Sequence, residues 1–243
     1  MSSITENVLL AKARIAAAAR EAGRDPGEIR LLAATKMNAP ERIAEAVAAG
    51  VDLCGENRVQ EFLAKSAVNA YAPCAVHFIG HLQKNNVKYL VGAVELIHSV
   101  DSLGLMEAIH ARAAALGLVQ DVLLEVNIGG EVSKSGVSPE GLGALLSAAA
   151  DLPGLRVRGL MTIPPAQAEA EETRAYFRRM RQLFVDIREK KYDNVLLTEL
   201  SMGMSGDYED AVRCGATIVR LGTALFGPRN YDKQEAPPHG TFG

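Results

Sequence analysis

The stretch LSMGMSGDYEDAVRCGATIVRLGTALFG (residues 200–227) indicates the fold, because it contains one full period of the pattern that repeats along the chain. An apolar run ending in LSMG is followed by a short polar segment and then by a second apolar run, TIVRLG. Both runs are almost continuously apolar, as expected of strands that are buried on both faces of a parallel sheet. The stretch predicts a strand, a covering helix and a second parallel strand.

Eight such apolar runs are found in the sequence. They occupy residues 29–35, 51–55, 76–80, 95–100, 121–128, 155–163, 195–203 and 217–222. Amphipathic segments separate them, and eight strand–helix units in 243 residues match the size of a closed (β/α)8 barrel. An open doubly wound sheet is the alternative, but no GxGxxG motif follows the first run. We therefore predict a single (β/α)8 barrel of the TIM type.

The chain begins with a further amphipathic segment that precedes the first strand. Its small and apolar residues fall on one helical face, at Val8, Ala11, Ile15, Ala18 and Ala22. This pattern predicts an extra N-terminal helix packed against the barrel. We expect the barrel to span residues 1–230 and residues 231–243 to form an irregular C-terminal tail.

Two of the predicted helices carry recognisable start signals. Asn38 precedes the segment after the first strand and is followed three residues later by Glu41, as in a capping box. Ser138 and Pro139 open the segment after the fifth strand.

Composition excludes several classes of protein. The chain is 48% hydrophobic and 23% charged, with a formal net charge of −3, so it lacks the basic excess of a nucleic-acid-binding surface. No apolar run reaches the roughly 18 residues that a membrane-spanning helix needs. The N-terminus lacks a secretory signal pattern, so we expect a cytoplasmic protein. Cys54, Cys74 and Cys214 are scattered and odd in number, which indicates buried free thiols.

Lys36 stands at the end of the first apolar run, where its side chain would point into the mouth of the barrel. A lysine in such a place is rare unless it is paired or functional. A desolvated lysine amine is a nucleophile for carbonyl carbon, so the natural chemistry is a Schiff base. The alternative is a lysine at the edge of a loop that reaches water.

Small and hydroxyl-bearing residues follow the last two strands, where barrels often bind phosphate. They are Ser201, Met202 and Gly203 after the seventh run and Gly222 and Thr223 after the eighth. Backbone N–H groups and hydroxyls at these positions predict a phosphate site. The alternative is that the glycines only form tight turns.

Several other polar residues fall near the predicted barrel mouth. Arg220, on the last strand, would face a carboxylate or a ring nitrogen of a ligand. His77 and His81 have no third metal ligand nearby in the sequence, so no metal site is predicted. We expect Asp207 to stabilise the start of a helix and Lys134 to be a solvated loop residue.

Six motifs together resemble the pyridoxal 5′-phosphate homeostasis protein family, whose barrel is similar to the N-terminal domain of alanine racemase. They are LLAATK, GENRVQE, HFIGHLQKN, NIGGEVSKSG, GLMTI and the stretch at residues 200–227. The resemblance implies pyridoxal 5′-phosphate as the cofactor, held as an aldimine on Lys36. It also implies a phosphate site at Ser201 and Thr223 and a pairing of Arg220 with the pyridine nitrogen.

By the same resemblance, the cofactor pocket would also be lined by Asn57, Met202, Gly203 and Gly222. A cationic partner disfavours protonation of the pyridine nitrogen, so the cofactor would be held without full activation.

The resemblance implies a protein of vitamin B6 homeostasis that supplies or buffers the cofactor. Pyridoxal-phosphate enzymes lacking their cofactor would be its recipients, and the missing racemase dimerisation domain points to a monomer. Racemisation needs two bases on opposite faces of the substrate carbon, and the sequence offers Lys36 alone. The alternatives are a pyridoxal-phosphate-dependent racemase or lyase, and a lysine-dependent aldolase.

Overall fold

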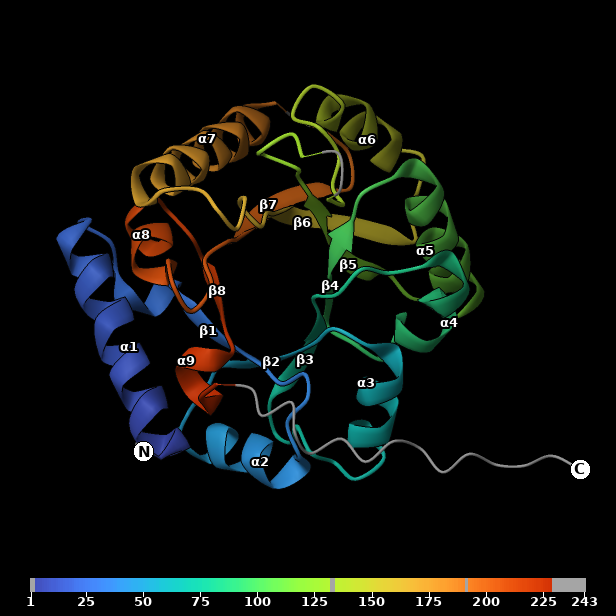
Figure 1. Cartoon of the computed structure of the whole chain (residues 1–243). Coiled ribbons are helices and arrows are strands. Elements are labelled where there is room, and N and C mark those ends of the chain that lie inside the picture. Colours follow the sequence, from blue (N-terminus) through green and yellow to red (C-terminus); the bar gives the residue numbers. More distant parts are fainter. Residues whose placement is uncertain (1–2, 132–133, 191, 229–243) are drawn as a thin grey trace, which may run out of the picture.

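The computed structural model describes residues 3–131, 134–190 and 192–228, and it confirms the predicted barrel. Eight strands close in chain order, each parallel to its neighbours, as the view along the barrel in Figure 1 shows. The strands are β1 (Arg30–Ala34), β2 (Leu53–Glu56), β3 (Ala75–Phe78), β4 (Leu96–Val100), β5 (Gln120–Glu125), β6 (Leu155–Met161), β7 (Val195–Ser201) and β8 (Ile218–Leu221). Each lies within one residue of a predicted apolar run or inside it.

Helices surround the strands on the outside of the barrel (Figure 1). They are α1 (Ile4–Glu21), α2 (Pro40–Ala48), α3 (Val59–Ser66), α4 (Val87–Leu90), α5 (Leu103–Ala115), α6 (Leu142–Ala149), α7 (Ala170–Glu189), α8 (Tyr208–Arg213) and α9 (Thr223–Phe226). Short 3-10 turns, η1 (Pro26–Glu28) and η2 (Lys84–Asn86), precede β1 and α4. The predicted tail at residues 231–243 lies outside the described residues.

The extra N-terminal helix is confirmed as α1. A capping box between Ser3 and Glu6 fixes its start, with Ser3 Oγ accepting from the Glu6 N–H at 3.1 Å and the reciprocal bond at 2.9 Å. Its buried face consists of Ile4, Val8, Ala11, Ile15, Ala18 and Ala19. Ala22 was expected on this face but is exposed, because the helix ends one residue earlier. The buried face packs against α2, α8 and α9.

The two predicted helix starts are wrong in detail. Ala39 precedes α2 without a capping side chain, because Asn38 instead donates from Nδ2 to the Lys36 carbonyl at 3.1 Å. Helix α6 begins at Leu142, and Ser138 accepts from the Gly141 N–H in the turn before it. In both segments the side chain predicted as a cap bonds a backbone group of the connecting loop, and Asn38 Oδ1 in addition accepts from the Arg42 side chain at 3.1 Å.

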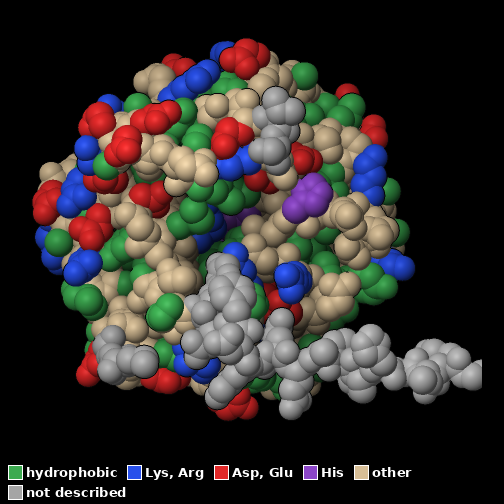
Figure 2. Space-filling view, in the orientation of Figure 1, with side chains coloured by type: hydrophobic (Ala, Val, Ile, Leu, Met, Phe, Trp, Pro, Cys, Tyr) green, Lys and Arg blue, Asp and Glu red, His purple; other side chains and the backbone are tan. Residues whose placement is uncertain are grey.

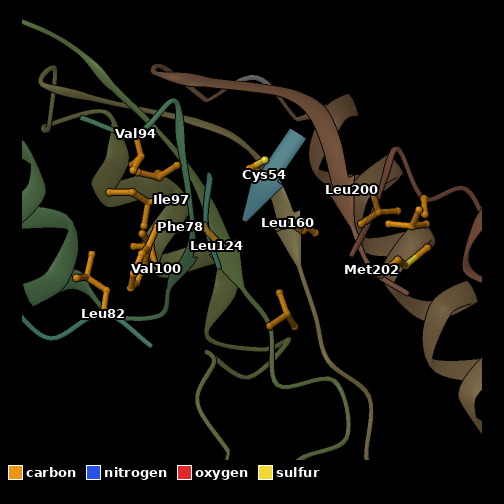
Figure 3. Packing of buried hydrophobic residues seen from close by; sticks show 14 of the residues in the cluster. Cys54, Phe78, Leu82, Val94, Ile97, Val100, Leu124, Leu160, Leu200 and Met202 are labelled. Carbon is orange, nitrogen blue, oxygen red and sulfur yellow. The ribbon is translucent and has the colours of Figure 1, made fainter. Parts of the chain in front are cut away.

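Two apolar cores stabilise the barrel. The larger one fills the space between strands and helices, and Figure 3 shows part of it, with Phe78 and Ile97 on one side and Leu200 and Met202 on the other. The smaller core lies among alternate strand residues on the opposite face, at Leu32, Ala34, Leu53, Ile79, Leu96, Leu123, Met161 and Ile218. This arrangement explains the nearly continuous apolar runs, since both faces of each strand are buried.

The three cysteines are free thiols, as predicted, although only Cys54 is fully buried and Cys74 and Cys214 are half-buried. No helix in the described ranges is long and apolar enough to cross a membrane. The same ranges contain no cluster of three His, Cys, Asp or Glu side chains suited to a metal ion.

Candidate functional site

A cavity of about 970 Å³ opens at the end of the barrel where β1 and β8 terminate. Its walls include Ala34, Lys36, Gly222, Thr223 and Phe226. The space-filling view shows this face of the molecule hollowed at its centre, with Lys and Arg side chains around the hollow (Figure 2). The structure therefore brings three of the predicted site residues, Lys36, Gly222 and Thr223, to one cavity, although they come from opposite ends of the chain.

The backbone on both sides of Lys36 is held by charged side chains from α3. The Thr35 carbonyl accepts from Lys65 Nζ at 2.9 Å, and the Met37 N–H donates to Glu61 Oε2 at 2.7 Å. Met37 has a φ of 59°, a left-handed conformation that costs energy for a residue with a side chain. These two bonds hold the turn in which Lys36, half-buried, projects into the cavity.

A buried carboxylate lies at the centre of this arrangement. Glu56, at the end of β2, is fully buried, and its Oε1 accepts from Lys65 Nζ at 2.6 Å and from the Thr35 hydroxyl at 2.6 Å. The Tyr71 hydroxyl donates to the same oxygen at 3.2 Å, and burial together with this carboxylate raises the pKa of Tyr71. Burial opposes ionisation of Glu61, but the bond from Met37 and the contact with Lys65 outweigh it and lower its pKa.

The ion pairs of Lys65 with Glu56 and Glu61 were not predicted from the sequence. The i, i+4 spacing of Glu61 and Lys65 on one helix could have indicated their ion pair, which measures 2.9 Å. The pairing of Lys65 with Glu56 depends on how α3 packs over β2, and the sequence carries no local signal for it.

Arg220 and Ser201 lie together in the barrel interior. Arg220 Nη1 donates to Ser201 Oγ at 2.6 Å, and Nη2 donates to the Thr162 carbonyl at 2.8 Å. Burial lowers the pKa of Arg220 to about 10 against the opposing charges of Asp207 and Glu125, so the guanidinium remains charged at neutral pH. The Ser201 hydroxyl is fully buried beside this guanidinium and does not line the cavity at Gly222 and Thr223.

The loops after β7 and β8 meet at Ser205, a residue that sequence analysis did not single out. Ser205 Oγ accepts from the Gly222 N–H at 3.2 Å and from the Ala224 N–H at 3.1 Å. An oxygen atom is thus held by two converging backbone amides, which is the way that loops bind phosphate oxygens. Gly203 has a φ of 92°, and a Cβ there would come within 2.5 Å of Ala211 Cβ, so this position requires glycine.

Asn57 and Met202 differ in what they offer to a ligand. Asn57 follows β2, and its buried Oδ1 has no hydrogen-bond partner among the described residues. A Cβ at Gly80 would lie 2.0 Å from the Asn57 carbonyl oxygen, so glycine at position 80 lets these loops pack closely. The Met202 side chain is fully buried in the outer core beside Leu200 (Figure 3), so its predicted place in the pocket concerns its backbone alone.

Glu125 adds a buried carboxyl at the end of β5 that sequence analysis also missed. The residue is only 9% exposed. Burial and the neighbouring Asp101 raise its pKa to about 7, while Arg220 acts in the opposite direction. The Glu125 carboxyl therefore titrates near neutral pH. It lies close enough to interact electrostatically with Arg220, the predicted partner of the cofactor ring.

Three other residues have surroundings that the sequence did not predict in full. Lys134, expected to be solvated, pairs with Glu131 at 2.6 Å and donates to the Pro164 carbonyl at 3.0 Å. Asp207 is the residue before α8, and its carboxylate accepts from the Met204 N–H in the preceding turn rather than from the helix. His77, considered as a metal ligand, lies fully buried inside the barrel instead.

A search of family models matches residues 11–230 to the alanine racemase N-terminal domain. This match places the chain in the class of barrels that the fold and the lysine-bearing mouth define. Among curated relatives, the pyridoxal phosphate homeostasis protein of Aquifex aeolicus is 50% identical over 90% of this chain and 95% of the relative. That of Pseudomonas aeruginosa is 45% identical over 95% of this chain and 98% of the relative. The chain belongs to the pyridoxal phosphate homeostasis protein family.

Solved structures agree with this membership. PipY of Synechococcus elongatus PCC7942, solved with pyridoxal phosphate (PLP) bound, has a TM-score of 0.79 and 36% identity, covering 93% of this chain and 100% of PipY. The crystal structure of an unknown protein from Bifidobacterium adolescentis has a TM-score of 0.85 and 40% identity, over 92% of this chain and 94% of that protein. Alanine racemase from Corynebacterium glutamicum shares the fold, with a TM-score of 0.69 at 16% identity, and this chain covers 63% of its length.

Proposed function

We propose that this protein binds pyridoxal phosphate at the mouth of its barrel, with Lys36 as the point of attachment, and acts in the homeostasis of that cofactor. The observation that carries the proposal is the position of Lys36, which lies half-buried in the cavity wall on a backbone held from both sides. Its relatives are named for pyridoxal phosphate homeostasis, and PipY was solved with the cofactor bound. We propose residues 1–230 as the binding unit.

Polar groups at the ends of β2, β7 and β8 suit this cofactor, although Arg220 and Asn57 do not line the cavity itself. A phosphate has anionic oxygens, and the Gly222 and Ala224 amides already hold one oxygen atom, that of Ser205. A pyridine ring offers a nitrogen acceptor, and Arg220 keeps N–H donors beyond the two that bind Ser201 and Thr162. The unsatisfied Asn57 Oδ1 would accept a bond from a polar group of the ligand.

Lys36 supplies the covalent chemistry. Its amine would be the nucleophile for the aldehyde carbon of bound pyridoxal phosphate, with loss of one water. The cofactor, when fully activated by a protonated ring, stabilises carbanions of amino acids. Arg220, cationic at neutral pH, would oppose protonation of a ring nitrogen placed beside it, because two neighbouring positive charges repel each other. The site thus favours retention of the cofactor over its use in catalysis.

The cellular role follows from reversible attachment. A protein that holds the aldehyde without activating it limits the concentration of free aldehyde and supplies the cofactor to enzymes that lack it. We propose such cofactor-free enzymes as recipients and a cytoplasmic monomer as the working form. Transfer is tested by mixing the loaded protein with a cofactor-free pyridoxal-phosphate enzyme and following that enzyme's activity; retention of the cofactor under excess acceptor would contradict the supply role.

Attachment is tested by titrating the purified protein with pyridoxal phosphate while recording the visible spectrum. We expect a yellow band that saturates at one equivalent in the wild type and is absent in Lys36→Ala. Lys88→Ala is the matched control, because Lys88 is an exposed lysine at the start of α4. Exchange of the α-hydrogen of amino acids in heavy water, measured across a panel, would instead indicate a racemase or a related enzyme.

A further inference from the structure

Five polar side chains form a continuous hydrogen-bonded line through the interior of the barrel. Arg220 Nη1 lies 2.6 Å from Ser201 Oγ, which lies 3.0 Å from His98 Nδ1. His98 Nε2 lies 2.9 Å from His77 Nδ1, and His77 Nε2 lies 3.2 Å from Glu95 Oε1. Since the line joins a guanidinium to a carboxylate through three uncharged groups, we call it the Arg220–Glu95 chain.

Members of the Arg220–Glu95 chain come from four different strands or their ends. Arg220 is on β8, Ser201 on β7, His98 on β4 and His77 on β3, and these four are 5% exposed or less. Glu95 directly precedes β4, and its side chain is 54% exposed. The Arg220–Glu95 chain therefore runs from a guanidinium buried inside the barrel to solvent at the end of the barrel where β4 begins.

Donor and acceptor rules fix one direction for every bond in the Arg220–Glu95 chain. A guanidinium can only donate, so Ser201 Oγ accepts from Arg220 and its own hydroxyl hydrogen is available for His98 Nδ1. His98 then carries its proton on Nε2 and donates to His77 Nδ1. His77 in turn carries its proton on Nε2 and donates to Glu95, which as a carboxylate can only accept.

The opposite direction would fail at the carboxylate. If His98 donated from Nδ1 to Ser201, its Nε2 would have to accept from His77 Nδ1. His77 Nε2 would then face Glu95 without a proton unless His77 were doubly protonated. Burial lowers the pKa of His77 and lowers that of His98 well below its ordinary value, so both rings are neutral.

We propose that Glu95 is a remote positioning residue for Arg220: through His77, His98 and Ser201 it fixes which way the guanidinium is held inside the barrel. Each link polarises the next, so a chain with a charge at both ends is stronger than its separate bonds. Loss of the terminal acceptor lets both imidazoles change tautomer, and Ser201 Oγ then becomes free to turn its hydrogen away from His98.

The charged groups around the exposed end also hold the Glu95 carboxylate in its ionised form. The bond from His77 is the largest influence that lowers the pKa of Glu95, and Arg30 and Arg158 act in the same direction. Arg30 Nη1 lies 3.8 Å from Glu95 Oε1, and Arg30 Nη2 lies 2.8 Å from Oε1 of Glu199 on β7. Glu199 contributes a comparable charge at this end but is not a member of the Arg220–Glu95 chain.

Tautomers of the two histidines test the inference directly in the protein without cofactor. In ¹⁵N-labelled full-length protein, we expect long-range ¹H–¹⁵N spectra to show His77 and His98 neutral, each with its proton on Nε2. His77→Gln and His98→Gln variants assign the signals. An Nδ1–H tautomer in either ring, or a doubly protonated His77, would overturn the proposal.

Variants of Glu95 test the remote effect. Glu95→Gln keeps an oxygen that accepts from His77, so both tautomers should persist, whereas Glu95→Ala should give mixed tautomers in both rings. Glu199→Gln, the control for lost charge, should leave the tautomers unchanged. Unaltered tautomers in Glu95→Ala would overturn the proposal.

The effect on the ligand rests on the proposed function and has its own readout. We expect Glu95→Ala to weaken pyridoxal phosphate binding about tenfold and Glu95→Gln to restore it to within about twofold of the wild type. Equal affinities for Glu95→Ala and the wild type would contradict the positioning role. If no variant binds the cofactor while the tautomers are as expected, the proposed function fails and the Arg220–Glu95 chain stands.

Discussion

Replacement of Lys65 by methionine should destabilise the protein strongly. Among the residues that the structure describes, Lys65 is the only cation that pairs with the buried Glu56. Lys65 Nζ makes three contacts, with Glu56 at 2.6 Å, Glu61 at 2.9 Å and the Thr35 carbonyl at 2.9 Å. Methionine fills a similar volume but cannot donate a hydrogen bond. Glu56 would keep three donors that carry no charge, the Thr35 and Tyr71 hydroxyls and the Asn57 N–H.

The size of the stability loss follows from the burial of the Lys65–Glu56 pair. The Lys65 side chain is 10% exposed, and that of Glu56 is fully buried. Removing one partner of a buried ion pair costs about 3–5 kcal/mol, because the other charge remains without compensation. This is a large share of the roughly 5–15 kcal/mol that stabilises a folded protein. At a urea m value of about 3 kcal/mol/M, the midpoint of unfolding should fall by about 1–1.7 M.

Urea unfolding followed by circular dichroism measures this shift. The double variant Lys65→Met/Glu56→Gln should recover at least half of the loss, because it removes the uncompensated charge. Lys88→Met, at an exposed position, should change the free energy of unfolding by less than about 0.5 kcal/mol. A Lys65→Met variant as stable as Lys88→Met would refute the claim that the ion pair holds the turn at Lys36.

Close packing at Gly80 and the raised pKa of Glu125 should also be visible in the stability of variants. Gly80→Ala should cost about 1–3 kcal/mol in urea unfolding, because its Cβ would lie 2.0 Å from the Asn57 carbonyl oxygen. Gly143→Ala, where a Cβ would meet nothing within 4 Å, should be neutral or stabilising by up to about 1 kcal/mol, and equal losses in both variants would contradict the packing account. Glu125, with its pKa raised to about 7 from 4.5, mainly by burial, contributes stability that is present below pH 4.5 and lost as the pH rises through 7. The free energy of unfolding of Glu125→Gln, measured relative to that of the wild type, should therefore rise by about 3 kcal/mol between pH 4.5 and pH 8. A constant difference between the two proteins over this range would show that Glu125 has an ordinary pKa.

The sequence predicted the barrel because the signals for it are local. Each strand is buried on both faces, so its residues form a short apolar run whatever their partners are. Helix starts were predicted less well, because side chains such as Asn38 have several local backbone groups to bind, and the choice depends on the loop. Ala22 was misplaced for a similar reason, since α1 ends one residue before it.

Only part of the candidate site could be predicted in this way. Lys36 was identified because a charge at the end of an apolar strand is conspicuous, and Gly222 and Thr223 because barrels bind phosphate after the last strands. The links between elements were not predictable. Lys65 reaches Glu56 across a helix–strand contact, and His98 reaches Ser201 over 103 residues of sequence.

Peptide mapping after reduction shows which lysine pyridoxal phosphate attaches to, and so tests Lys36 as the attachment residue. The protein is incubated with one equivalent of pyridoxal phosphate, reduced with borohydride, digested and analysed by mass spectrometry. We expect the added pyridoxyl-phosphate mass on the peptide that contains Lys36, and on no other peptide at this stoichiometry. Modification of a different lysine, with Lys36 unmodified, would contradict the account.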